Sequence, residues 1–170
     1  VRIFASYHYE QVAMARNTTH IPVMAGLAGL HAFIKEKIGV EVGTLGDDFL
    51  SGSLGGRIRE NVVRFRSIME ATQALKDDRV SAVMGTRSEL EAGLGTLPAN
   101  ILIAPFHVTG IPVNGWNLGL ATKAENTVLA ATLERTVADL VQDGTIGRIF
   151  AKYGAKHVPP RAAGGEHQEL

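Results

Sequence analysis

The stretch ATQALKDDRVSAVMGTR, residues 71–87, contains the alternation of helix and strand that decides the fold. Just before it, Ser67 with Glu70 three residues later matches a capping box, so we predict that a helix begins there. Ile68 and Leu75 lie on one side of this helix. The run RVSAVMG that follows indicates a buried strand. A helix of this kind, placed between strands, is typical of the crossover in an α/β protein.

Elements of the same two kinds flank this stretch. Upstream we predict strands over 11–16, 40–42 and 61–67, helices over 27–38 and from Asp47, and a flexible glycine-rich break at 52–56. Downstream we predict a helix over 88–94 and a strand over 100–106. The β-α-β-α-β order favours an α/β fold with a parallel-rich central sheet flanked by helices.

The last third of the chain has a different pattern. A strand is predicted over 115–123, and a long helix from near Asn126 to Gly144. The helix carries one apolar stripe, formed by Leu129, Leu133, Val137 and Leu140. A short helix then ends at Gly154, with an apolar side formed by Ile146, Ile149, Phe150 and Tyr153. The segment 155–170 has prolines, glycines and no periodicity, so we expect a flexible tail.

Composition restricts the possible functions. The chain has 170 residues, and its 17 Lys and Arg balance 17 Asp and Glu, so it lacks the basic surface that nucleic acid binding requires. Cysteine is absent, which excludes disulfides and thiolate metal sites. No apolar run is long enough to span a membrane. The first residues show neither an initiating methionine nor a secretory pattern, so we expect that a signal peptide was removed or was never present.

Three stretches of the chain resemble the type 2 periplasmic solute-binding proteins, in the amino-acid-binding group known as family 3. They are GVEVGTLGDDFL at 39–50, the stretch at 71–87, and NLGLATKAENTVLAATLERTVADLVQDGTIGRIFAKYG at 117–154. SYHYEQ at 6–11 is similar to a further family segment. The likeness runs from about residue 4 to 154, but it matches only the later part of the family pattern.

The resemblance implies a division of the chain into four parts. Residues 1–16 would be the end of lobe one and the first hinge strand, and residues 17–114 a complete lobe two. Residues 115–154 would supply the second hinge strand and the C-terminal helices that return to lobe one, before the tail at 155–170. Because most of lobe one is missing from this pattern, we expect a further segment, a second chain or a swapped copy to cover the apolar side of these helices.

The resemblance also implies where a ligand would bind. In the family, a glycine-threonine turn between a strand and a helix offers N–H groups, a hydroxyl and a helix N-terminus to an anion such as a carboxylate. Gly43 and Thr44 match this turn, whereas Leu45 stands where a second hydroxyl residue is common. Asp47 and Asp48 add negative charge there. An ordinary turn with Asp47 as the N-cap is the alternative interpretation.

A second group of candidate residues follows the predicted strand at 79–85. The family has an aspartate there for the ammonium group of an amino acid, but this chain has Thr86, which makes an α-amino acid a less favoured ligand. Arg87 is a candidate anion contact or a salt-bridged surface residue. Near the hinge strands, Tyr7, Trp116 and Asn117 are candidates for lining the ligand site, or for packing and turn formation.

Enzyme functions receive little support from the sequence. The chain has no GxSxG, phosphate-loop or GxGxxG motif and no histidine pair at metal-ligand spacing, so we expect no catalysis, metal or cofactor. The leading hypothesis is a periplasmic protein that captures a small polar or anionic ligand by lobe closure and presents it to a membrane transporter. The alternative is an accessory or sensor module of the same fold that binds a periplasmic protein and has a degenerate ligand site.

Overall fold

The computed structural model describes residues 2–24, 26–107 and 114–162. The chain divides into two compact units, one comprising Gln11–Asn114 and the other the residues before and after it. Strand β1 (Arg2–Asn17) contributes its first half to one unit and its second half to the other. Each unit is therefore described separately.

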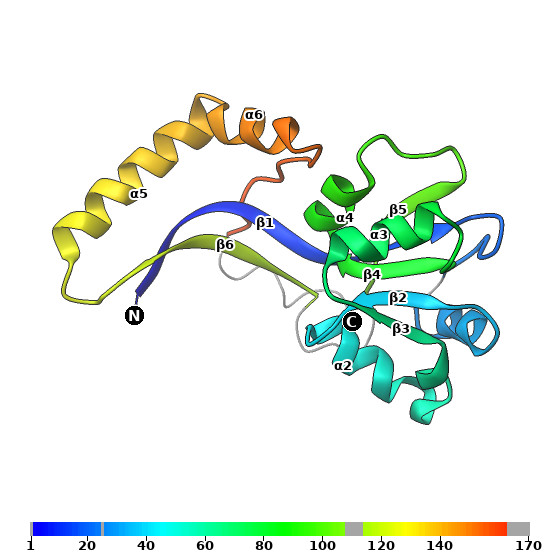
Figure 1. Ribbon diagram of the computed structural model, residues 1–170. Helices are drawn as coiled ribbons and strands as arrows, with labels where there is room; N and C mark the ends of the chain where they lie inside the picture. Colours follow the sequence, from blue (N-terminus) through cyan, green and yellow to red (C-terminus); the bar gives the residue numbers. More distant parts are fainter. Residues whose placement is uncertain (1, 25, 108–113, 163–170) are drawn as a thin grey trace. The chain divides into compact units, whose positions relative to one another are not determined.

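The unit Gln11–Asn114 is built on a mixed sheet with the strand order β3-β2-β4-β1-β5 (Figure 1). Strand β2 (Ile38–Glu41) lies parallel to β3 (Val62–Phe65) and to β4 (Ala82–Thr86). Strand β1 is antiparallel to β4 and also to β5 (Ile101–Pro105), so β5 runs in the same direction as the other three. The predicted parallel-rich α/β sheet is confirmed, with β1 as its one reversed strand among these five.

Helices cover both faces of this sheet. On one face, α3 (Ile68–Lys76) and α4 (Arg87–Leu94) pack over β1, β4 and β5 (Figure 1). The core under them consists of small and branched residues, including Ala13, Ala74, Leu75, Val83 and Leu90, each at most 1% exposed. On the other face, α2 (Leu45–Gly52) lies against β2 and β3.

The sequence predicted the start of α3 correctly. Ser67 caps the helix by accepting a hydrogen bond from the Glu70 N–H at 3.3 Å, as the capping box indicated. The carboxylate of Glu70 accepts from the N–H of Arg66 at 3.2 Å. Val63 and Phe65 of β3 both pack on the core beneath α3, as their spacing implied.

One predicted element of this unit was wrong. In place of a helix over 27–38 the chain forms a short α1 (Gly26–Gly29) and a 3-10 turn, η1 (Leu30–Ile34). The turn stops early because the side-chain amide of Asn61 donates to the carbonyls of Phe33 and Ile34, at 2.9 and 3.0 Å, and satisfies them. The glycine-rich break predicted at 52–56 is present: α2 ends at Gly52, and in η2 (Ser53–Gly56) Leu54 and Gly55 adopt left-handed φ angles of 51° and 66°. The 3-10 turn η3 (Arg59–Asn61) follows it.

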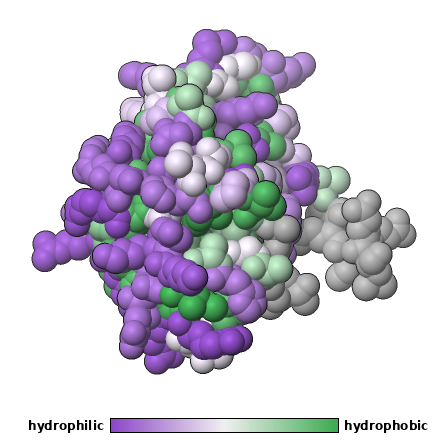
Figure 2. Space-filling view, turned by 90° about the vertical axis from the view of Figure 1, so that its right-hand side faces the viewer, coloured by the Kyte–Doolittle hydropathy of each residue, from purple (hydrophilic) through white to green (hydrophobic). Residues whose placement is uncertain are grey.

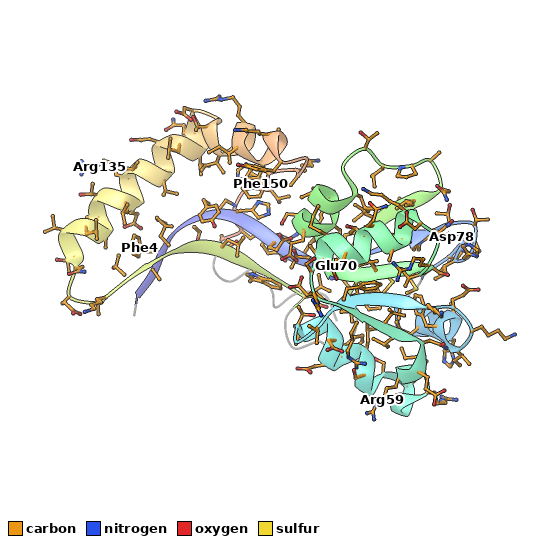
Figure 3. The ribbon with its side chains drawn as sticks, in the orientation of Figure 1. Phe4, Arg59, Glu70, Asp78, Arg135 and Phe150 are labelled. Atoms are coloured by element: carbon orange, nitrogen blue, oxygen red, sulfur yellow. The ribbon has the colours of Figure 1, made fainter. Side chains whose placement is uncertain are left out.

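In the other unit, the first half of β1 pairs with β6 (Gly115–Thr122), and these strands carry α5 (Thr127–Gln142). Phe4 and Ala5 of β1 pack against Ala130 and Val137 of α5, and Figure 3 shows the Phe4 side chain lying between strand and helix. Val137 and Leu133 of the predicted stripe face inward, but Ala130 takes the place expected for Leu129, which is 49% exposed. Tyr7, Leu120, Leu133 and Val141 complete this cluster.

Helix α6 (Thr145–Lys152) and the residues after it also differ from expectation. Ile149 and Tyr153, predicted to face inward, are 47% and 66% exposed. Phe150 does point from α6 toward β1 (Figure 3), where its ring lies 4.3 Å from the ring of His8. Residues 155–162, predicted to be a flexible tail, form hydrogen bonds with β1 and β6, and residues 163–170 lie outside the described residues.

Hydrophilic side chains dominate the face of the molecule shown in Figure 2, and hydrophobic ones lie there in small separate groups. Within the described residues, no helix combines the length and the hydrophobicity that crossing a membrane requires.

Candidate ligand-binding site

The candidate site in Gln11–Asn114 lies at the carboxyl ends of two neighbouring parallel strands. Val40 of β2 pairs with Met84 of β4, so the turn after β2 and the start of α4 after β4 emerge side by side. Gly46 in the first turn of α2 confirms this closeness, because a Cβ atom there would lie 3.3 Å from Val40 and 3.5 Å from Met84. In open α/β sheets, ligands bind outside such carboxyl ends.

The turn after β2 has the conformation that its sequence requires. Gly43 adopts φ +74°, in the left-handed region that favours glycine, with open space where a side chain would be. Thr44 is the N-cap of α2: its hydroxyl accepts a hydrogen bond from the Asp47 N–H at 3.4 Å and donates one to the carbonyl of Glu41 at 2.8 Å. Thr44, rather than Asp47, therefore begins the helix.

The buried carboxylate of Asp47 stabilises this turn by accepting hydrogen bonds. One carboxylate oxygen accepts the Gly43 N–H at 3.2 Å, and the other accepts Nε of Arg64 at 2.7 Å and the Ser51 hydroxyl at 3.2 Å. Asp47 is only 7% exposed, while the Arg64 side chain is 39% exposed. The ion pair offsets the negative charge that Asp47 would otherwise place at the helix N-terminus.

These internal bonds leave part of the turn available to a ligand. Among the described residues the backbone N–H groups of Leu45 and Gly46 have no hydrogen-bond partner, and they lie at the positive end of α2. Two apolar side chains border them, because Val42 is 54% exposed and Leu45 is 44% exposed. This turn can therefore accept a carboxylate or carbonyl oxygen beside an apolar surface.

The start of α4 presents a carboxylate. The Thr86 hydroxyl donates to Glu89 at 2.6 Å, and the Thr86 N–H reaches the same oxygen at 3.4 Å. Glu89 is exposed, and its second oxygen accepts no hydrogen bond within the described part of the chain. Arg87 forms an ion pair with Glu91 at 2.8 Å, so the salt-bridge interpretation of this arginine is the one that the structure favours.

Glu41 adds a further carboxylate at this edge, where it accepts the N–H of Ile68 at the start of α3 at 2.9 Å. Sequence reasoning missed Glu41, Arg64 and Glu89. Glu89 could have been found, because Thr86 with Glu89 repeats the spacing recognised at the start of α3. Arg64 and Glu41 act through contacts between elements, which no local pattern reveals.

The other predicted site residues lie in the second unit, where the structure gives two of them packing or structural contacts. Tyr7 is half-buried against the cluster under α5. Both polar atoms of the Asn117 side chain bind the backbone of Arg161, at 2.7 and 2.9 Å. Trp116 is half-buried in β6. No group of three or more metal-ligating side chains occurs among the residues that the structure describes.

Comparison with known proteins gives a consistent fold. No protein-family model and no curated protein matches the sequence. Solved structures do match it. An ancestral cationic amino acid solute-binding protein has a TM-score of 0.69 at 15% identity, over 91% of this chain and 62% of that one. The GluR0 ligand-binding core in complex with L-glutamate has a TM-score of 0.61 at 17% identity, over 90% and 63%.

A third structure is an amino acid ABC transporter substrate-binding protein from Streptococcus pneumoniae, bound to L-arginine. Its TM-score is 0.62 at 13% identity, over 89% of this chain and 60% of that one. The fold is therefore that of the type 2 periplasmic solute-binding proteins, as the sequence resemblance predicted. The chain spans about three fifths of the length of these structures.

Proposed function

We propose that this chain acts as a periplasmic solute-binding protein that captures a small polar solute by lobe closure and delivers it to a membrane transporter. The observation that carries the proposal is the arrangement at the carboxyl edge of Gln11–Asn114. Open N–H groups at the start of α2 and the carboxylate of Glu89 at the start of α4 follow the carboxyl ends of two neighbouring parallel strands, β2 and β4.

This arrangement favours a solute with an amine over the purely anionic one considered from the sequence. Glu89 can bind an ammonium group with its second oxygen, and Glu41 and Asp48 add negative charge nearby. The N–H groups of Leu45 and Gly46 can bind a carboxylate or carbonyl oxygen of the same molecule. The names of two similar structures, which mention a cationic amino acid and L-arginine, agree with this chemistry.

Thermal unfolding in the presence of amino acids, organic acids and amines tests the proposal. A solute that binds only the folded protein stabilises it by about 2.7 kcal/mol at a concentration of 100 times its dissociation constant. We expect amine-containing solutes to raise the melting temperature and organic acids to leave it unchanged. No shift with any of the three classes would contradict capture of a solute.

Glu89→Gln tests the role of the carboxylate, with Glu70→Gln as the matched control. Both residues lie at the third position of a helix and pair with a capping hydroxyl residue, but Glu70 lies in α3. A charged hydrogen bond contributes about 1.5–3 kcal/mol, so we expect Glu89→Gln to weaken binding roughly 10- to 100-fold. Equal affinities for the two variants would exclude Glu89 from the site.

The alternative is an accessory or sensor module that binds a periplasmic protein. It is favoured by the internal use of groups that a ligand would need: Asn117 binds Arg161, Arg87 pairs with Glu91, and the Thr86 hydroxyl binds Glu89. Co-purification of one partner protein, together with an unchanged melting temperature in all solutes, would support this alternative.

The apolar side chains exposed on α5 and around α6 fit a further proposal about assembly. Val128, Leu129, Ile149 and Tyr153 are between 47% and 82% exposed. We expect a further segment, a second chain or a swapped copy to cover them, as the sequence indicated. Light scattering at several protein concentrations would separate association between chains from coverage within one chain.

A further inference from the structure

We propose that residues 155–162, here called the strap, form a pH-dependent latch that His8 of β1 holds closed only in its neutral form. The inference concerns one unit alone and does not depend on the proposed function. It rests on three sets of contacts between the strap and the paired strands β1 and β6.

The first set binds the strap to β1 by its backbone. The Tyr9 N–H donates to the carbonyl of Val158 at 2.9 Å, and the Val158 N–H donates to Nδ1 of His8 at 3.2 Å. Nε2 of His157 lies 2.6 Å from the carbonyl of Tyr7 and donates to it. The strap therefore runs beside Tyr7, His8 and Tyr9 as an added backbone segment.

The second set fixes the end of the strap. The Asn117 side chain of β6 forms two hydrogen bonds with the Arg161 backbone, at 2.7 and 2.9 Å. The Arg161 guanidinium lies 3.8 Å from the centre of the Tyr9 ring, a cation–π contact. Gly115 makes room for this ring, since a Cβ atom there would lie 2.2 Å from the Tyr9 hydroxyl.

The third set surrounds the imidazole of His8, which is 1% exposed. Phe150 of α6 stacks on it at 4.3 Å, and His157 of the strap lies 5.7 Å away. Nε2 lies 3.8 Å from the carboxylate of Glu10, on the same strand. These contacts assign the tautomer, because Nδ1 accepts the Val158 N–H and the proton must then be on Nε2.

Protonation of His8 at Nδ1 is incompatible with the closed strap. The new N–H would point at the N–H of Val158, so one hydrogen bond is lost and two donors face each other. Glu10 and Phe150 belong to β1 and α6, so they remain beside His8 whether the strap is closed or open. What opening changes directly at the ring is the Val158 bond, and its loss leaves Nδ1 free to take up a proton.

The sign of the pH dependence follows from this difference. The open strap binds a proton that the closed strap excludes, so opening becomes easier as the pH falls through the usual range of histidine. With a histidine that titrates near pH 6.5 when open, the opening equilibrium should rise about tenfold between pH 7.5 and pH 5.5. His157 also contacts β1, through Nε2 and the carbonyl of Tyr7, so a variant of His157 is needed as a control.

Hydrogen exchange of the Val158 and Tyr9 amides in the full chain tests the latch. Protection factors, which correct for the chemical effect of pH on exchange, should fall about tenfold from pH 7.5 to pH 5.5. His8→Asn places an amide oxygen near the position of Nδ1 and does not titrate, so its protection should not change with pH. His157→Gln keeps a donor for Tyr7 and should retain the full dependence of the unmodified chain.

Two results would overturn the proposal. One is a pH-independent protection factor in the unmodified chain, which requires no variant to fold. The other is loss of the dependence in His157→Gln with the dependence intact in His8→Asn, which would assign the titration to His157.

Discussion

Replacement of Asp47 by alanine should loosen the turn that begins α2. The change removes three hydrogen bonds, to Gly43, Arg64 and Ser51, at 3.2, 2.7 and 3.2 Å. Arg64 is partly exposed and can rehydrate, so its share is at the low end for a charged bond, about 1.5 kcal/mol. When the lost bonds to Gly43 and Ser51 are added, we expect Asp47→Ala to lower the opening free energy by about 2–3 kcal/mol in total.

Two further variants calibrate this loss. Asp47→Asn keeps one acceptor oxygen, which cannot accept from both Gly43 and Arg64. We therefore expect it to lower the opening free energy by about 1–1.5 kcal/mol. Asp48→Asn is the matched control, because Asp48 is exposed in the same helical turn and interacts mainly with the helix dipole, worth about 0.5 kcal/mol.

Native-state hydrogen exchange of the Val40 and Met84 amides is the suitable assay. The chain has two units, so a single global unfolding curve would mix their stabilities, whereas these amides report on the sheet beside α2. If Asp47→Ala and Asp48→Asn lower the opening free energy equally, the carboxylate of Asp47 does not hold the turn, and the reasoning is refuted.

Three other predictions can be checked on single variants. Gly43→Ala should lower the opening free energy measured by hydrogen exchange of the Val40 amide by about 1 kcal/mol, and Gly43→Asn clearly less, because the strain lies in the left-handed backbone. Equal losses for the two variants would argue against this strain. Gly93→Ala should lower the stability of the fold by about 1–3 kcal/mol, since its Cβ would lie 2.5 Å from Oγ1 of the buried Thr72. Adding Thr72→Ala to this variant should restore part of the lost stability. If it restores none, a clash with Thr72 is not the cause of the loss. Asp143 should titrate by NMR below its ordinary pKa of 3.8, because the side chain and the N–H of Thr145 donate to its carboxylate. A carboxyl with a lowered pKa stabilises the fold above its unfolded pKa and loses that effect as the pH falls through the folded pKa. Thr145→Val should therefore raise the NMR titration midpoint, and an unchanged midpoint would contradict the hydrogen bond.

Local signals in the sequence were sufficient for much of the fold. Ser67 with Glu70, and the apolar run at 80–84, predicted α3 and β4 because a cap and a buried strand depend mainly on neighbours in the chain. The reversed direction of β1 between β4 and β5 could not be predicted in this way, since strand order is set by contacts between distant segments.

The candidate site was predictable to a similar extent. Gly43 and Thr44 were named because they match the glycine-threonine turn of the family that the sequence resembles, whereas the capping pattern alone suggested Asp47 as the N-cap in place of Thr44. The support of Asp47 by Arg64 joins residues on α2 and β3, and no spacing rule connects them. Asn117 was a candidate either for a ligand contact or for a structural role, and its observed partner, Arg161, lies too far along the chain for the sequence to indicate it.

The position of β1 in the sheet has a consequence for synthesis of the protein. Its second half is made before all of its partners in Gln11–Asn114, because β4 begins at Ala82 and β5 at Ile101. Roughly 65 residues separate Asn17 from Ala82, which at about 5–20 residues per second leaves this apolar strand unpaired for several seconds. During that interval Val12, Met14 and their neighbours form a hydrophobic segment that a ribosome-associated chaperone could bind.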